Sequence, residues 1–427
     1  MPAETEVSDS AAPAPRRAWW RNVAVFLAVL GPGLITASVD NDAGGITTYS
    51  VAGSHYGYGL LWTLVPITVA LIVVQEMCAR MGVVTGKGLA DLIRENFGVK
   101  VTFWMSVALI VANLGNVIAE FAGVAASLQI FKVPILLSVP LAALAVWLLV
   151  LKGTYQSVEK FFLVASVFYI AYPVSLAFAH PDWGEVARAS FVPHVRWDAK
   201  YIGMLIGMVG TTIAPWMQFY LQSAVVEKGV KLEHYRFSRL DVIAGCLVTD
   251  LVAFAIVVAC AATLHQAGVK VETADQAAMA LAPLAGKYAS WLFAFGLFNA
   301  SFFAAAILPL STAYYVCEAF GWESGVDSKY TEAKQFYWLY SSILALGALV
   351  VLIPKLPLVP IMLISQIVNG VLLPFILVFM LILINREKLM GEYRNGRWFN
   401  GIAWVTAIVM IALTVYLVVA GVVGLFA

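Results

Sequence analysis

Charged side chains are scarce in this sequence, because Lys, Arg, Asp and Glu make up 12% of its 427 residues while 62% are hydrophobic. Soluble domains carry about 25% charged residues, so the composition excludes a water-soluble protein of this length. The formal net charge is +1, which leaves no basic face for binding nucleic acid. Runs of about 20 apolar residues recur along the chain, and they are typical of a polytopic α-helical membrane protein.

Cysteine is also rare. The four cysteines lie within or at the ends of apolar runs and lack the spacing of metal ligands, so we expect no disulfide framework.

The sequence contains no HExxH motif, no paired catalytic carboxylates and no Ser–His arrangement, so we expect neither an enzyme nor a cofactor. Residues 1–21 lack a signal-peptide cleavage pattern and are predicted to form a disordered cytoplasmic tail.

The apolar runs predict eleven transmembrane spans. They cover residues 22–54, 57–83, 101–130, 133–151, 157–179, 199–227, 238–264, 286–319, 336–353, 357–385 and 399–425. A cytoplasmic N-terminus places most Lys and Arg residues on the cytoplasmic side, as the positive-inside rule requires. The C-terminus is then external, and the expected location is the cell membrane. Residues 85–98 are too charged to span and predict a short amphipathic helix on the cytoplasmic side.

Two of these spans contain residues that interrupt a helix. The first contains the stretch DNDAGG at residues 40–45, and the sixth contains a glycine, two threonines and Pro215. Unwound backbone at membrane depth is tolerated where it lines a cavity or binds a ligand. Interrupted spans at matching positions in two halves indicate a transporter with inverted repeats and a site at the midplane. We predict repeats at 22–179 and 199–385, which form a core at 22–385, with 399–425 as an added eleventh helix.

Several acidic residues lie within the apolar spans. Asp42 is the first candidate ion ligand, because a carboxylate near the bilayer centre costs about 3–17 kcal/mol unless it has a partner. Asp40 is a second candidate, which would either face the external vestibule or cap the broken helix. Glu120 would help to attract a divalent ion, with pairing to a neighbouring helix as the alternative. Asp250 in the seventh span has no assigned partner.

The sequence resembles the Nramp family of divalent-metal transporters, which have a LeuT-like fold of the APC superfamily. The resemblance rests on GPG at 31–33, the Asp-plus-glycine break, GVVTGKGLADL at 82–92, YLQSAVV at 220–226 and LLPF at 372–375. It implies an all-α protein with a five-plus-five inverted repeat. It also implies alternating access, with a divalent metal ion as the substrate bound between the broken helices.

The sequence departs from the family pattern at the implied metal site. The family has Asp-Pro-Gly-Asn in the first break. This chain keeps the aspartate as Asp42 but has Gly45 in place of the asparagine. A family methionine before the proline of the sixth span is Ala214 here, while Asn369 matches a family glutamine. The resemblance therefore implies a pocket lined by Glu120 and these residues, with Ala214 offering its main-chain carbonyl.

Loss of the thioether favours a hard ion, because carboxylate, carbonyl and water oxygens suit magnesium, calcium and manganese. Magnesium gives up its water reluctantly, so a wider pocket without the two side chains suits a partly hydrated Mg²⁺. The sequence thus resembles the Nramp-related magnesium-transporter branch, with Mn²⁺ as a further candidate ion. Met217 is a second possible source of sulfur, although methionine commonly fills gaps in a core.

Proton coupling is the other departure. The family has an Asp and a Glu on the third helix and a His on the sixth, where this chain has Asn113, Asn116 and Gln222. Amides do not titrate, so we expect uptake without proton coupling by a monomer in the lipid bilayer. Two alternatives stay open: a proton-coupled Mn²⁺/Fe²⁺ transporter of the same family, and a sodium-coupled amino-acid transporter of the same fold.

Overall fold

The protein is helical throughout the residues that the computed structural model describes, which are 31–152, 171–279, 286–326 and 328–426. Nine segments in these ranges are long and apolar enough to cross a membrane. The predicted all-α membrane fold is therefore confirmed. The predicted tail at 1–21 and most of the predicted span at 157–179 lie outside the described residues, so the number of eleven spans and the division into repeats stay predictions.

Both expected interruptions are present as pairs of short helices. The first pair is α2 (Pro32–Val39) and α3 (Ala43–Tyr56), which leaves residues 40–42 outside regular helix. The second pair is α11 (Ala199–Thr212) and α12 (Pro215–Glu227). Pro215 takes the first position of α12, where its missing amide hydrogen costs no hydrogen bond.

The remaining α-helices of the described residues lie between and after these two pairs. They are α4 (Leu61–Thr85), α5 (Leu89–Phe97), α6 (Val99–Gln129), α7 (Ile135–Lys152), α9 (Ala171–Phe178), α10 (Trp183–Phe191), α13 (Tyr235–Cys260), α14 (Ala274–Ala278), α16 (Ala289–Phe320), α17 (Lys334–Val351), α18 (Leu358–Ile384), α19 (Glu387–Met390) and α20 (Arg397–Phe426). Helix α5 buries Leu89 and Leu92 while Glu95 pairs with Lys87 at 2.7 Å, as expected for an amphipathic segment.

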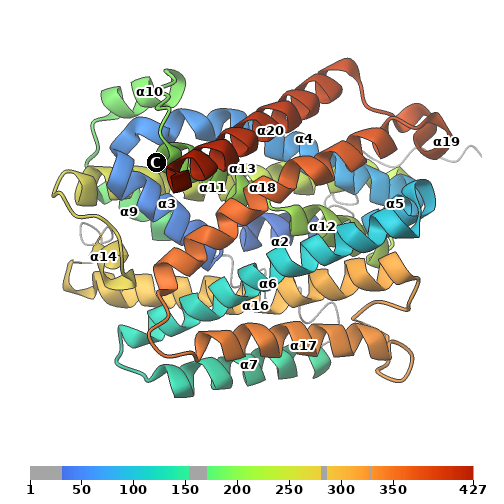
Figure 1. Ribbon diagram of the computed structural model, residues 1–427, viewed down its shortest axis with the longest axis horizontal. Helices are drawn as coiled ribbons and strands as arrows, with labels where there is room; N and C mark the ends of the chain where they lie inside the picture. The colour runs from blue at the N-terminus through green and yellow to red at the C-terminus, as the bar shows by residue number, and fades with distance from the viewer. Residues whose placement is uncertain (1–30, 153–170, 280–285, 327, 427) are drawn as a thin grey trace, which may run out of the picture.

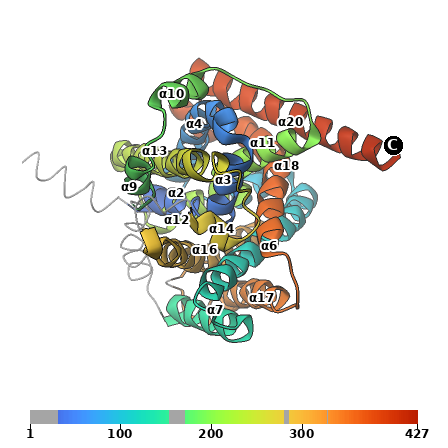
Figure 2. The ribbon, with the colours of Figure 1, turned by 90° about the vertical axis from the view of Figure 1, so that its left-hand side faces the viewer.

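The broken helices lie in the middle of the bundle (Figures 1 and 2). Helix α13 packs on both α2 and α3, while α6 and α18 pack on α3. Helices α7 and α17 lie together along one edge of the bundle, and α20 runs along the opposite edge (Figure 2). Helix α20 packs on α4, α11 and α18, and its role as an eleventh helix added to the core stays a prediction.

Helix α2 is held tightly against α13. A Cβ atom on Gly33 would lie 2.7 Å from the backbone of Val242, so only glycine allows this approach. Asp241 of α13 accepts hydrogen bonds from the amides of Gly33 (2.7 Å), Leu34 (3.2 Å) and Gly31 (3.3 Å). The first amides of a helix have no partner within it, and a carboxylate also complements the positive end of the helix. Asp241 therefore fixes the start of α2.

Helix α18 approaches α11 closely enough for backbone contact. A Cβ atom on Gly210 would overlap the carbonyl oxygen of Gln366 and the amide of Gly370. Small residues at such positions let membrane helices pack backbone to backbone. The contact brings the polar side chains of α18 beside the first break.

Candidate metal site

Asp42 caps the second half of the first broken helix. Its backbone is extended, with φ −72° and ψ −174°, and its side-chain oxygen Oδ1 accepts a hydrogen bond from the amide of Gly45 at 2.6 Å. Gly44 and Gly45 lie within the first turn of α3 and not in the unwound segment, which corrects the predicted position of the break. The N-terminus of a helix favours negative charge, so α3 stabilises the Asp42 carboxylate at this point.

Glu120 of α6 faces the same turn. It is completely buried, and its Oε2 accepts a hydrogen bond from the amide of Ala43 at 3.2 Å, while Oε1 has no partner among the described residues. The carboxyl groups of Glu120 and Asp42 therefore accept amides two residues apart in the first turn of α3. In the described ranges neither forms an ion pair with a basic side chain. Neighbouring carboxylates repel each other, so a proton or a cation has to compensate them.

Two hydroxyl groups near this carboxyl pair were not identified from the sequence. Thr211 Oγ1 and Ser301 Oγ are buried and have no hydrogen-bond partner within the described part of the chain. Thr211 Oγ1 would be 3.3 Å from a Cβ atom on Gly45, and Ser301 Oγ lies with the Ala43 side chain beside Gly123. A buried hydroxyl without a partner costs about 1–3 kcal/mol. A water molecule or an ion next to the carboxyl pair would satisfy both groups.

Gly45 provides its backbone amide to the site, and the packing around it leaves no room for a side chain. A Cβ atom at this position would overlap the carbonyl oxygen of Asp40 and come 3.3 Å from the Thr211 hydroxyl. The asparagine of the family pattern therefore does not fit here in this conformation. Gly44 is similarly constrained, because its Cα packs against the side-chain amide of Gln366. Gln366 of α18 therefore packs directly on the first turn of α3.

A chain of amides joins α6 to α16 and α18. Asn113 donates to the carbonyl of Leu308 and to the Thr312 hydroxyl, both at 2.7 Å. Asn116 and Asn369 exchange two hydrogen bonds, at 2.9 and 3.1 Å, and Asn369 also donates to Gln366 Oε1 at 3.0 Å. The predicted ligand Asn369 is thus held in this network, which reaches the break through Gln366.

The carbonyl of Ala214 is already hydrogen-bonded. It accepts from the amide of Met217 at 3.1 Å. When the Gln218 amide nitrogen faces the backbone, it donates to Ala214 O at 2.6 Å and to Pro215 O at 2.7 Å. An ion bound to Ala214 would displace this side chain, and Gln218 was not identified from the sequence. Met217 is completely buried in the hydrophobic core, which agrees with its interpretation as a packing residue.

Asp40 does not belong to the same hydrogen-bonded group as Asp42. Its backbone amide donates to Ala37 O at 3.2 Å at the end of α2. Both side-chain oxygens are buried without a partner among the described residues, so the Asp40 side chain does not cap a helix there.

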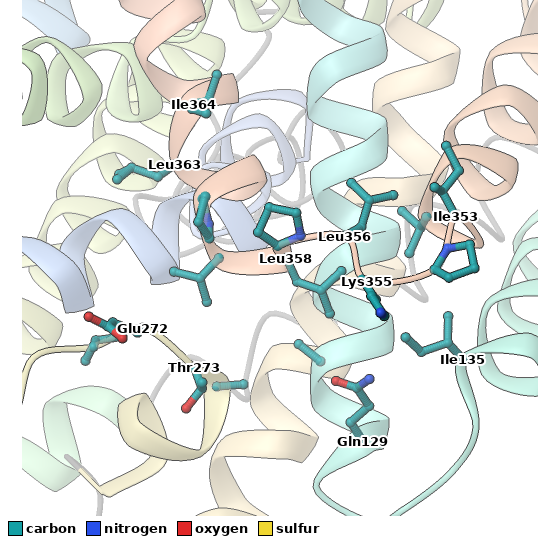
Figure 3. A pocket seen from close by; sticks show the side chains of 18 of the residues that line it. Gln129, Ile135, Glu272, Thr273, Ile353, Lys355, Leu356, Leu358, Leu363 and Ile364 are labelled. Carbon is teal, nitrogen blue, oxygen red and sulfur yellow. The ribbon is translucent and has the colours of Figure 1, made fainter.

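A cavity of about 1100 Å³ opens where α3 and α6 end and α18 begins (Figure 3). Its charged lining residues are Glu272 and Lys355, and it contains none of the predicted site residues. Within the described ranges, no group of three or more His, Cys, Asp or Glu side chains is placed to hold a metal ion. A metal site at the break therefore depends on two carboxylates together with neutral oxygen atoms.

Two broken helices around a buried carboxyl pair define the architecture of an inverted-repeat membrane transporter. Residues 33–420 match the family described as natural resistance-associated macrophage protein-like, or Nramp, so the chain belongs to this family. It is 29% identical to the divalent metal cation transporter MntH of Deinococcus radiodurans, covering 93% of this chain and 91% of that one. Identity to the MntH protein of Klebsiella pneumoniae is 27%, covering 94% and 96%.

Solved structures confirm the fold. The manganese transporter of Eremococcus coleocola superposes with a TM-score of 0.76 at 22% identity, covering 97% of this chain and 89% of that chain. MhsT in complex with L-phenylalanine gives a TM-score of 0.58 at 15% identity, covering 91% and 97%. These similarities confirm the predicted LeuT-like fold. The matched relatives are transporters, in agreement with the expectation that the chain is not an enzyme.

Proposed function

We propose that the protein carries a divalent metal ion across the membrane by alternating access, with the ion bound beside Asp42 and Glu120. The observations that carry this proposal are that both buried carboxyl groups accept amides of the first turn of α3 and that neither forms an ion pair within the described residues. A dication compensates both charges at once. The names of the MntH relatives support a divalent metal as the substrate.

We further propose Mg²⁺ as the ion. The groups at the break are oxygen donors: two carboxylates and the hydroxyls of Thr211 and Ser301. Ala214 offers no sulfur, and Met217 is buried in the apolar core. Mg²⁺ keeps several of its waters when it binds to one or two carboxylates. The two hydroxyls without partners are suited to hold such waters.

Mn²⁺ is the second candidate, and the relatives favour it. One structural neighbour is named a manganese transporter, and carboxylate and water oxygens suit manganese as well as magnesium. The amino-acid alternative rests only on the shared fold. Because the chain belongs to the Nramp family, that alternative is disfavoured.

Transport without proton coupling is part of the proposal. Asn113 and Asn116 are held in the amide chain described above, and Gln222 donates to the carbonyl of Lys87 at 2.8 Å. These hydrogen bonds support a structural role for the three side chains. Recording the internal pH of liposomes during Mg²⁺ uptake tests this part, and acidification in proportion to uptake would contradict it.

The main test is Mg²⁺ flux into liposomes that contain the wild type, Asp42→Ala or Asp91→Asn. Asp91 is a matched control, because it lies on α5 beside Arg94 and away from the break. We expect flux in the wild type and the control but not in Asp42→Ala. Parallel assays with Mn²⁺ and Cd²⁺ determine the selectivity. Normal flux in Asp42→Ala would refute the site, and uptake of Mn²⁺ but not Mg²⁺ would assign the protein to the second candidate.

A further inference from the structure

A second group of acidic residues lies beside the first break. Asp250 of α13 is 6% exposed and Asp40 is 2% exposed, and all four of their carboxylate oxygens lack a hydrogen-bond partner among the described residues. The side-chain oxygen of Asn41 is also buried and unpartnered there. Each such acceptor is costly to bury, so this group requires an explanation that the Asp42–Glu120 pair does not provide.

Hydrogen bonds of Thr249 join α13 to the first broken helix. The Thr249 hydroxyl donates to Ala37 O at the end of α2, and it accepts from Asn41 Nδ2 at 2.6 Å. Asp40 precedes Asn41 in the unwound segment, and Asp250 follows Thr249 along α13. The hydrogen bonds of Thr249 therefore hold the unwound segment, with Asp40 and Asn41, against the turn of α13 that carries Asp250.

The surroundings of this junction do not compensate the negative charge. Within the described residues, neither Asp40 nor Asp250 forms an ion pair with a basic side chain. Thr68 of α4 also lies beside Asp250, but its hydroxyl donates to Leu64 O at 2.7 Å. The C-terminal end of α2 adds partial negative charge.

We propose that Asp40, Asp250 and the side-chain oxygen of Asn41 form a second binding site for a divalent cation, next to the site at Asp42. These three side chains carry five buried acceptor oxygens without donors among the described residues. One dication accepts all five as ligands and neutralises both carboxylates, whereas protonation of both supplies only two donors. Oxygen atoms are the ligands that hard dications take in proteins.

The second site binds the transported ion before or after that ion occupies the site at Asp42. This role rests on the proposed function, although the binding itself does not. Asp40 and Asp42 are two residues apart, so cations in the two sites repel each other and an ion in one site weakens binding in the other. Such repulsion between neighbouring sites helps a bound ion to leave.

Calorimetric titration of the full-length purified protein with Mn²⁺ tests the proposal. We expect two ions to bind per wild-type chain, one in Asp250→Asn, one in Asp42→Ala and two in the control Asp91→Asn. Asp250→Asn keeps the shape of the side chain, and thermal unfolding checks that the variant is folded. Anomalous scattering from Mn²⁺-containing crystals should place the second ion between Asp40 and Asp250.

The two proposals fail in different ways. One ion per wild-type chain, lost in Asp42→Ala and retained in Asp250→Asn, would overturn the second site and leave the proposed function intact. Two ions that both persist in Asp250→Asn would likewise overturn it. If the wild type binds no divalent ion, the proposed function fails together with the second site.

Discussion

Glu120 on α6 accepts a hydrogen bond from the backbone amide of Ala43 at 3.2 Å, at the first residue of α3. This contact links two helices that are 77 residues apart in sequence. Asp42 accepts the Gly45 amide in the same turn, so Glu120 both positions the start of α3 and adds charge to the proposed ion site. These two contributions are separable by mutation.

Glu120→Gln should separate them. The glutamine keeps an oxygen for the Ala43 amide but removes the charge, so the protein should unfold near the wild-type temperature. The apparent affinity for Mg²⁺ should fall at least about tenfold. The reason is that the cation loses the attraction of one negative charge in a site that water screens poorly. Flux measured against Mg²⁺ concentration gives the affinity. Glu120→Ala should reduce both stability and affinity, and an unchanged affinity in Glu120→Gln would exclude its charge from binding.

Substitution of Gly45 tests whether packing excludes the asparagine of the family pattern. Gly45→Ala should lower stability by about 1–3 kcal/mol, the usual cost of overpacking, because its Cβ would overlap Asp40 O. Gly59→Ala is the matched control, since no atom lies within 4 Å of that Cβ. Thermal unfolding compares the two variants. Equal stability would mean that the break relaxes readily, and Gly45→Asn should then be tolerated as well.

The sequence predicted the position of both interruptions because Pro215 and the acidic and glycine residues at 40–45 are local signals. It did not predict that Gly44 and Gly45 would belong to α3. That assignment depends on Asp42 accepting the Gly45 amide, and on Gln366, which is far away in sequence, packing on Gly44. Contacts between distant helices leave no periodic pattern in one sequence.

The site itself was predictable only in part. Asp42 and Glu120 were identified because carboxylates are rare in apolar spans. Thr211, Ser301 and Gln218 were missed, because small polar residues are common in membrane helices and hydrogen-bond to their own backbone there. Their relevance depends on which neighbours they meet after folding.

Ala214→Met tests whether the missing thioether determines ion selectivity. The substitution restores the sulfur of the family pattern at the second break, and thioethers favour softer ions. We expect Cd²⁺ to inhibit Mg²⁺ flux more strongly in this variant than in the wild type. Met217→Leu is the matched control, because Met217 is buried in the core and should not affect inhibition. A large loss of Cd²⁺ inhibition in Met217→Leu would instead identify Met217 as the source of sulfur.

Asp241 should matter for stability and not for ion selectivity. Asp241→Ala removes the acceptor for three backbone amides at the start of α2. Each buried donor that loses its partner costs about 1–3 kcal/mol, and the positive helix end loses its nearby carboxylate. We therefore expect a large fall in the unfolding temperature in detergent, with an unchanged ratio of Mg²⁺ to Mn²⁺ flux in the protein that remains folded. A changed flux ratio at wild-type stability would show that Asp241 acts on the ion and not on α2.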